Sequence, residues 1–284
     1  AGLVTDISVQ LPVMVLIILG GFGFLVIGDF SDTLKTNIAR FRNNEKGRKR
    51  LSFHTKIVLS MSALLILTGT VVFLALEWNN GYSELDGGHK FLAALFQSVT
   101  MRTAGFCTVD QSALTEASVA FTTLLMFIGA SPGSTGGGIK TTTLFVLCII
   151  IMSTIRGKKN ISFRKRNIGD TTVRKCLAVL FLAVFTIAVA VFLICVIERN
   201  NTSLDSYGAP VMNIGNIIYE PVSAFSTVGL SRGVVSSAAG LSKATLAFVM
   251  LTGRVGVMTL GYAIAKTNKN DSGIQYTDAK IMIG

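Results

Sequence analysis

The sequence is poor in charged residues, and poorest in acidic ones. Only 14% of its 284 residues are charged, with 15 acidic against 26 basic side chains, whereas 50% are hydrophobic. Soluble domains carry charge on about 25% of their residues. The shortage of charge excludes an ordinary soluble domain. Together with several long apolar runs, it predicts an all-α integral membrane protein.

Clusters of chemically reactive side chains are absent as well. The four cysteines lie in different segments without metal-ligand spacing, and the two histidines lie near predicted membrane boundaries. No residues form a catalytic cluster, so we predict neither an enzyme nor a bound cofactor. The first apolar run lacks the basic start and the small-residue cleavage site of a signal peptide, and we expect it to remain in the protein.

Five apolar runs are candidates for crossing the membrane. A spanning helix needs about 20 apolar residues. The predicted segments are 11–30, 57–77, 117–155 with an interruption, 177–197 and 241–265. We therefore expect a multi-pass protein of the cell membrane.

The net charge of +11 is distributed in a way that indicates orientation rather than nucleic-acid binding. Basic residues gather in two connections, 35–56 and 156–175, which the positive-inside rule places in the cytoplasm. The acidic residues of the connections after 77 and 198 then lie outside, and the tail after residue 266 lies inside. The basic segments are expected to attract anionic membrane lipid, with docking of an acidic cytosolic partner as the alternative.

Polar, small and glycine residues interrupt the apolar pattern at 98–106. The preceding run, 91–99, is far too short to cross a hydrocarbon core of about 30 Å. A short dip followed by an extended return predicts a re-entrant loop, and such backbone occurs at membrane depth only inside protein or beside water. We expect the first filter loop, Thr103, Ala104, Gly105 and Phe106, to face a pore.

The same pattern returns 124 residues later. Thr227, Val228, Gly229 and Leu230 form a second filter loop, and Met126-Phe127-Ile128-Gly129 matches Met250-Leu251-Thr252-Gly253 at the same offset. A constant offset across two motifs indicates an internal duplication. We predict two complete units, 57–172 and 173–284. Residues 1–56 then hold the closing helix of an earlier copy and a linker, so that the chain is expected to start inside a repeat.

A glycine-rich stretch, 129–143, interrupts the third apolar run. Its three consecutive glycines and Pro132 cannot continue a stable helix, so the helix is predicted to break there and restart before Phe145. A phosphate-binding loop is excluded, because Ile139 separates Gly138 from Lys140 and the stretch follows no soluble strand. Simple helix packing through glycine is the alternative to a functional loop.

Arg254 lies well inside the last apolar run. A charge at the centre of the bilayer costs about 2.5–3.5 kcal/mol on insertion scales, so an inward-facing functional role is the default interpretation. We expect Arg254 to pair with carbonyl groups of the 129–143 loop and to act as a barrier to cations. Snorkelling to the interface is the alternative.

These motifs together resemble the KtrB/TrkH/HKT superfamily of potassium transporters, and its KtrB-type subunits most of all, over essentially the whole chain. The resemblance implies repeated helix–pore loop–helix units around a pseudo-four-fold ion pore, with the end of repeat 2 and repeats 3 and 4 present here. It implies K⁺ at the carbonyls of Thr103, Gly105, Thr227 and Gly229, with Na⁺ as a second candidate. It also implies an intramembrane gate formed by Gly133, Ser134, Thr135, Gly136, Gly137, Gly138, Lys140 and Arg254.

The resemblance further implies a homodimer in a bacterial cell membrane and a cytosolic nucleotide-binding ring that acts on the gate. An ion-coupled secondary transporter of a small solute is the main rival, since such proteins also use broken helices at the midplane. Their repeats are commonly inverted, whereas the two loops here are re-entrant from the same side. A non-conducting scaffold is a third class, which has no use for aligned glycines at pore depth.

Overall fold

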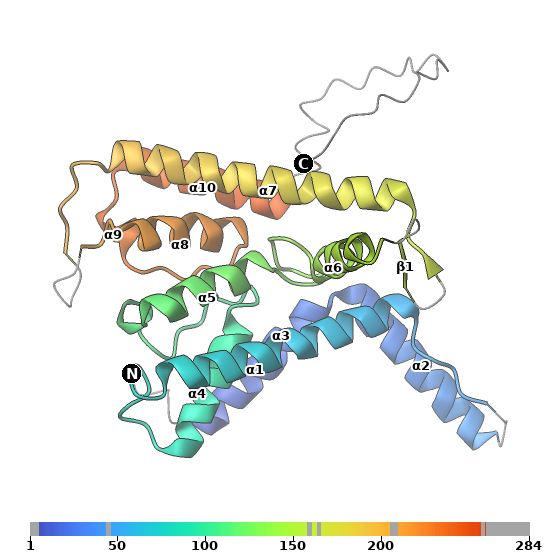
Figure 1. Cartoon of the computed structure of the whole chain (residues 1–284). Coiled ribbons are helices and arrows are strands. Elements are labelled where there is room, and N and C mark those ends of the chain that lie inside the picture. Colours follow the sequence, from blue (N-terminus) through green and yellow to red (C-terminus); the bar gives the residue numbers. More distant parts are fainter. Residues whose placement is uncertain are drawn as a thin grey trace, which may run out of the picture.

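The computed structural model is almost entirely helical, as the composition predicts (Figure 1). It describes residues 6–43, 47–157, 161–163, 166–204, 210–256 and 259. Its helices are α1 (Ile7–Phe22), α2 (Phe24–Arg42), α3 (Phe53–Glu77), α4 (Gly87–Thr100), α5 (Glu116–Phe127), α6 (Thr141–Ile155), α7 (Asp170–Ile197), α8 (Ile214–Phe225), α9 (Val234–Ser237) and α10 (Gly240–Val255), with one 3₁₀ turn, η1 (Gln111–Ala113). A short antiparallel hairpin, β1 (Ser162–Phe163) and β2 (Arg166–Asn167), precedes α7.

Two helices within the described residues are long and apolar enough to cross a membrane by themselves. They are α3, with 25 residues, and α7, with 28. Both begin before the predicted segments, because their first turns extend into the basic connections. The bent pair α1 and α2 becomes a third candidate if it is counted as one span.

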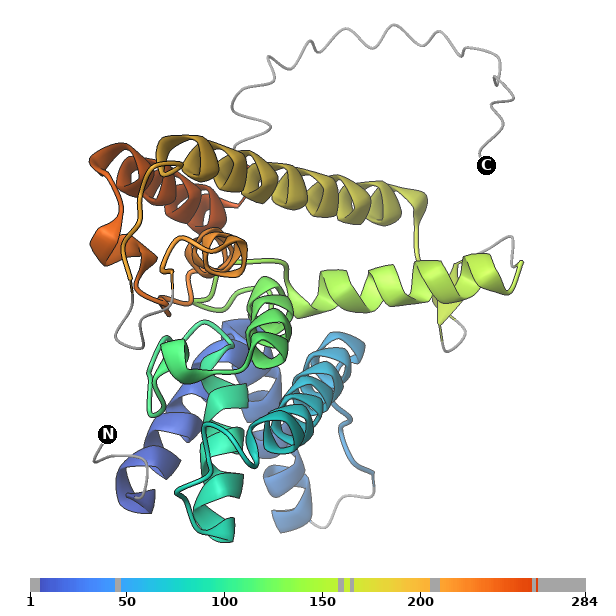
Figure 2. The same ribbon diagram turned by 60° about the vertical axis from the view of Figure 1, so that its left-hand side comes forward.

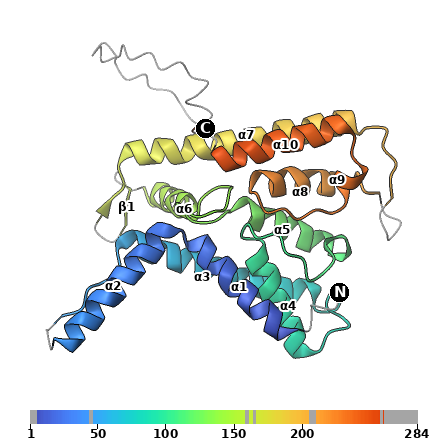
Figure 3. The ribbon, with the colours of Figure 1, turned by 180° about the vertical axis from the view of Figure 1, so that it is seen from behind.

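The predicted single helix over 11–30 is wrong. Helices α1 and α2 meet at an angle of 97°, and Figure 3 shows the sharp corner between them. Gly23 lies at the corner with φ +78°, a backbone angle that disfavours any side chain with a Cβ. A Cβ at this position would also lie 2.6 Å from the Pro132 carbonyl oxygen. The helix breaks because another segment packs directly against its backbone.

The two predicted units share one order of elements: a long helix, a short helix, a filter loop and a further helix. In the first, α4 packs against α3, and α5 follows the first filter loop; in the second, α8 packs between α7 and α10. Figures 1 and 3 show α10 lying alongside α7, with α8 beneath both. One hydrophobic cluster joins the units, with side chains from α4, α5, α7, α8 and α10. Val228 and Leu230 of the second filter loop belong to this cluster, as does Met101, which lies just before the first loop.

The final helix departs from its predicted range. The sequence predicts a segment over 241–265, and the structure gives α10 from Gly240 to Val255. Gly256 follows with φ +92°, which ends the helix. The rest of the predicted segment lies largely outside the described residues, as does the predicted cytoplasmic tail.

Candidate functional site

Each filter loop follows a short pore helix and carries the same unusual backbone. Thr103 and Thr227 have φ values of +68° and +54°, and they are the only residues other than glycine with positive φ in the described part of the chain. A β-branched residue in this region is a genuine outlier. Such strained angles cost about 1–3 kcal/mol and persist only where the surroundings impose them. Their recurrence at an offset of 124 (227 − 103) marks corresponding positions in the two units.

The backbone of each loop turns again two residues later. Gly105 and Gly229 have φ values of +75° and +92°. The loops also touch, because a Cβ at Gly105 would lie 2.2 Å from the Val228 carbonyl oxygen. The two predicted filter segments thus come together and leave room only for glycine at the first position.

Side chains of the short helices α4 and α8 form hydrogen bonds to carbonyl groups of the two loops. Thr100 Oγ1 donates to the Phe106 carbonyl at 2.7 Å, and Ser223 Oγ donates to the Leu230 carbonyl at 2.7 Å. The Val228 N–H donates to the Ser223 carbonyl at 2.9 Å. With these carbonyls and N–H groups occupied at the rear, the loop geometry is held by bonds that do not involve an ion.

The glycine-rich segment forms the predicted break between α5 and α6, which Figure 2 shows as an irregular stretch between the two green helices. Its ends lie side by side, because the Gly129 N–H donates to the Ile139 carbonyl at 2.9 Å and the Ile139 N–H donates to the Phe127 carbonyl at 3.2 Å. The segment is therefore a closed loop rather than an unwound stretch of helix.

This loop packs directly against both filter loops. The Gly137 N–H donates to Thr227 Oγ1 at 2.8 Å. A Cβ at Gly136 would lie 2.3 Å from Thr103 Oγ1, and both glycines are buried. The tip of the loop thus contacts the two strained threonines, one from each unit.

Two basic side chains hold the loop from the other side. Arg254 Nη1 donates to the Thr135 carbonyl, the type of contact that the sequence predicts for this residue. Lys140 Nζ donates to the Gly136 carbonyl from within the loop itself. The two acceptors are the carbonyls of the peptide bonds before and after the Cα of Gly136, the residue that contacts Thr103. Arg254 and Lys140 place two positive charges close to the filter loops.

The corner between α1 and α2 holds the remaining edge of the loop. The Phe24 N–H donates to the Gly133 carbonyl at 3.2 Å, and the Ser131 N–H donates to the Gly21 carbonyl at 3.1 Å. The loop is consequently attached to three parts of the chain: the helix corner, the filter loops and α10.

A further cation, Arg102, was not predicted as a site residue. It precedes the first filter loop, is 6% exposed and donates from Nη2 to Ser62 Oγ at 2.9 Å. Beside it a cavity of about 250 Å³ extends between α1, Thr103 and Thr135. A signal for Arg102 is present in the sequence, because it stands directly before Thr103 in an apolar segment. A charged residue at that place is as unusual as Arg254 in its helix, and it indicates a functional role in the same way.

Two glutamates at the ends of the long helices were also missed, because they were interpreted only as acidic residues outside the membrane. Glu77 is fully buried and accepts from the N–H and Oγ1 of Thr115 at 3.0 and 2.7 Å. Glu198 accepts from the Ala239 N–H at 2.7 Å and from Ser242 Oγ at 2.6 Å. Thr115 and Ala239 precede α5 and α10, so each glutamate joins the long helix of its unit to the helix after the filter loop and satisfies a free helix N-terminus.

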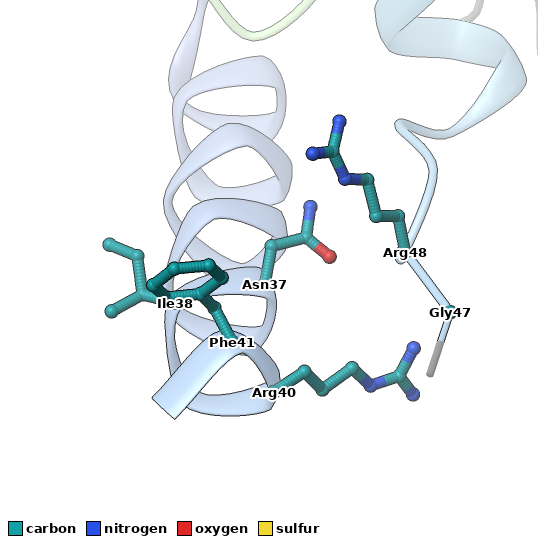
Figure 4. Close-up of a pocket in the computed structure, with 6 residues that line it drawn as sticks. All are labelled: Asn37, Ile38, Arg40, Phe41, Gly47 and Arg48. Carbon is teal, nitrogen blue, oxygen red and sulfur yellow. The ribbon is translucent and has the colours of Figure 1, made fainter. Parts of the chain in front are cut away.

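The basic connection after α2 forms a pocket of its own, about 490 Å³ in volume (Figure 4). Arg40 extends toward Gly47, and Arg48 lies across from Asn37. Asn37 holds the connection in place, because its Nδ2 donates to the Lys49 carbonyl at 3.1 Å and its Oδ1 accepts from the Lys49 N–H at 2.7 Å. Phe41 is 91% exposed at the same end of α2. This face combines positive charge with apolar surface.

Comparison with known proteins shows which family shares this sequence. A family model described as a cation transport protein, TrkH, matches residues 3–276. The Ktr system potassium uptake protein B of Vibrio alginolyticus is 35% identical over 99% of this chain, and the potassium/sodium uptake protein NtpJ of Enterococcus hirae is 32% identical over 99%. The chain spans 57% and 58% of the lengths of these two relatives.

A solved structure shares the fold. The potassium transporter TrkH from Vibrio parahaemolyticus superposes with a TM-score of 0.67 over 92% of this chain and 53% of its own, at 17% sequence identity. The family match covers nearly all of the chain, and the curated relatives support it over the same residues. The chain belongs to the TrkH family of cation transport proteins.

Proposed function

We propose that this chain conducts monovalent cations, K⁺ in the first place, between the filter loops 103–106 and 227–230 and past a gate formed by 133–138. One observation carries the proposal: the tip of the glycine-rich loop contacts both filter loops at once, at Thr103 and Thr227. A segment with that placement obstructs any ion leaving the filter toward the inner side. Backbone carbonyls of the filter replace part of the water shell of the ion.

The position of the basic side chains supports the same role. Arg254 and Lys140 both donate to carbonyls of the loop and so keep positive charge beneath the filter. A fixed positive charge opposes the passage of a cation while the loop is closed. Opening then requires the loop, and the cations bound to it, to move aside.

Two relatives carry the names potassium uptake protein and potassium/sodium uptake protein, which supports K⁺ with Na⁺ as a second transported ion. The name "Ktr system" supports action together with other subunits. We propose a homodimer in the cell membrane, regulated by a cytosolic nucleotide-binding ring that docks on the basic side. The division into 1–56, 57–172 and 173–284 is part of this proposal. A transport role is favoured over catalysis, and a channel-like pathway over a secondary transporter of small solutes.

Rubidium uptake tests the proposal. The full natural protein is reconstituted into liposomes, and radioactive rubidium is followed under an inward electrical driving force. External K⁺ should compete with rubidium at lower concentration than Na⁺ does. Liposomes that take up rubidium no faster than protein-free ones, with the protein inserted and folded, would refute a cation pathway.

A further inference from the structure

Glu220 is a buried carboxylate behind the second filter loop. It lies in α8, one turn before Ser223, and is 3% exposed. A buried carboxylate requires donors around it, because the loss of hydration is otherwise expensive. The sequence contains no hint of those donors, since Glu220 stands among apolar residues of the pore helix.

The donors come from the residues that leave the filter. Glu220 Oε1 accepts from Ser231 Oγ at 2.6 Å and from the Arg232 N–H at 2.9 Å. Ser223 Oγ, on the same helix, binds the Leu230 carbonyl at 2.7 Å. The outer end of the filter, 230–232, is therefore bound to α8 through three consecutive residues, and two of these bonds end on one carboxylate oxygen.

The side chain of Arg232 extends this arrangement to the other unit. It is 6% exposed, and its Nη2 donates to the Ser112 carbonyl at 3.3 Å. Its Nη1 lies 4.0 Å from Glu116 Oε1 at the start of α5. Glu220 thus holds the backbone of a residue whose side chain reaches across to the first unit.

In the first unit, neutral groups hold the segment that follows the filter loop. Gln97, on pore helix α4, donates from Nε2 to Gln111 Oε1 at 2.9 Å, and Gln111 Nε2 donates to the Val109 carbonyl at 2.9 Å. Tyr219 Oη, next to Glu220, donates to Gln111 Oε1 at 3.3 Å, so the two sets of bonds adjoin. A carboxylate thus holds the residues that follow the second loop, whereas neutral amides hold Val109 and Gln111 after the first loop. Hydrogen bonds to charged groups are about twice as strong as those between neutral groups.

We propose that Glu220 is a positioning residue for ion selectivity: its carboxylate fixes the outer end of the 227–230 loop, and with it the spacing of the carbonyls that an ion meets. The inference rests on the proposed cation pathway and adds to it a residue that touches no ion. Without the carboxylate, the N–H of Arg232 and the hydroxyl of Ser231 lose their acceptor, and residues 230–232 are free to shift. A looser ring of carbonyls discriminates less between K⁺ and the smaller Na⁺.

The test compares Glu220→Gln and Glu220→Ala with wild type in the full natural protein, reconstituted in liposomes. The ratio of Na⁺ to K⁺ permeability is obtained from reversal potentials under bi-ionic conditions. Glu220→Ala should raise this ratio by roughly tenfold, the size expected when bonds to a charged group are lost. Glu220→Gln should raise it by less, because the amide oxygen can take the place of Oε1 and accept both bonds, although without the negative charge.

Glu198→Gln is the matched control. Glu198 is 5% exposed and accepts from a backbone N–H and a serine hydroxyl, as Glu220 does, but it joins α7 to α10 away from the filter. It should lower the melting temperature and leave the permeability ratio unchanged. An unchanged ratio in both Glu220 variants would overturn the inference, and so would an equal rise in Glu198→Gln. Wild type without cation flux would instead refute the proposed function, so the two failures are distinguishable.

Discussion

The two units are alike where α5 and α10 begin and differ where these two helices end. Helices α5 and α10 start at corresponding residues, Glu116 and Gly240 (240 − 116 = 124), and both are joined to the preceding long helix by a buried glutamate. Helix α5 then ends at Phe127 to make room for the loop, whereas α10 continues to Val255 and carries Arg254. The first unit contains the glycine-rich loop, and the second contains the arginine that donates to the Thr135 carbonyl of that loop.

The comparison teaches that one backbone plan is used twice in different surroundings. The same filter backbone, with left-handed threonine and glycine, is built twice. Its surroundings are not the same, since Phe106 is 56% exposed and the corresponding Leu230 is 2% exposed. Residues that correspond in sequence should consequently respond differently to the same substitution, which the following experiments test.

The largest effect is expected from shortening the glycine-rich loop of the first unit. Deletion of several residues from 133–138 removes the contacts with Thr103 and Thr227 and should raise rubidium uptake about tenfold, which corresponds to a loss of about 1.4 kcal/mol of closed-state stability. Ser134→Ala keeps the loop length and removes only the bond from its hydroxyl to the Ser131 carbonyl. Equal uptake by the deletion variant and wild type, at equal incorporation, would contradict a gate.

A glycine pair sharpens the comparison of the filters. Gly105→Ser combines an unfavourable φ with a Cβ that would lie 2.2 Å from the Val228 carbonyl oxygen. A Cβ at Gly229 would have no non-neighbouring atom of the described residues within 4 Å. Gly229→Ser then carries only the conformational cost, about 1 kcal/mol. We expect the loss of K⁺ over Na⁺ discrimination to be larger for Gly105→Ser. Equal ratios in the two variants and in wild type would remove both residues from the filter.

A smaller, graded effect is expected at Arg254. Arg254→Ala removes both the bond to the Thr135 carbonyl and the positive charge, so uptake should rise a few fold. Arg254→Lys keeps the charge but loses the planar group, and should be intermediate. The series is measured as rubidium uptake per inserted protein. A flat series, or loss of uptake in the alanine variant alone, would assign Arg254 to anchoring the helix.

The smallest effect is a dependence of stability on pH at Glu198. Burial alone would raise the pKa of Glu198, but hydrogen bonds from Asn201, Ser242 and the Ala239 N–H hold it below the usual value of 4.5. The folded state therefore binds a proton less readily than the unfolded state. This stabilisation is complete above the usual pKa and disappears as the pH falls through the lowered one.

Glu198→Gln should accordingly lower the free energy of unfolding by about 1–3 kcal/mol at neutral pH. The difference from wild type should shrink as the pH falls below about 4. Melting curves in detergent at several pH values measure both quantities. A difference that stays constant with pH would show that the lost stability comes from packing rather than from the charge.

Patterns that repeat along the chain could be predicted, whereas contacts between distant segments could not. The offset of 124 related the segments 103–106 and 227–230, which share their unusual backbone angles. The glycines and Pro132 predicted the break after Phe127, because such residues leave a local signal in an apolar run. The corner at Gly23 was missed, since its cause is the Pro132 carbonyl more than 100 residues away. Glu77, Glu198 and Glu220 were not predicted as structural acceptors, because their donors lie on other segments. The roles of the filter and gate residues stay predictions until ion flux is measured.

The corner at Gly23 has a mechanical consequence. Helix α2 has 19 residues and is about 28 Å long at 1.5 Å per residue. Its first residue is bonded to Gly133 of the loop, and its far end carries Arg40 and Arg42. Helix α2 can act as a lever that pivots at Gly23. A rotation of one degree about that corner moves its far end by about 0.5 Å, and it moves the contact between Phe24 and Gly133 by far less. If α2 rotates about Gly23, a small force acting over a large displacement at its basic end is converted into a larger force over a small displacement at the loop.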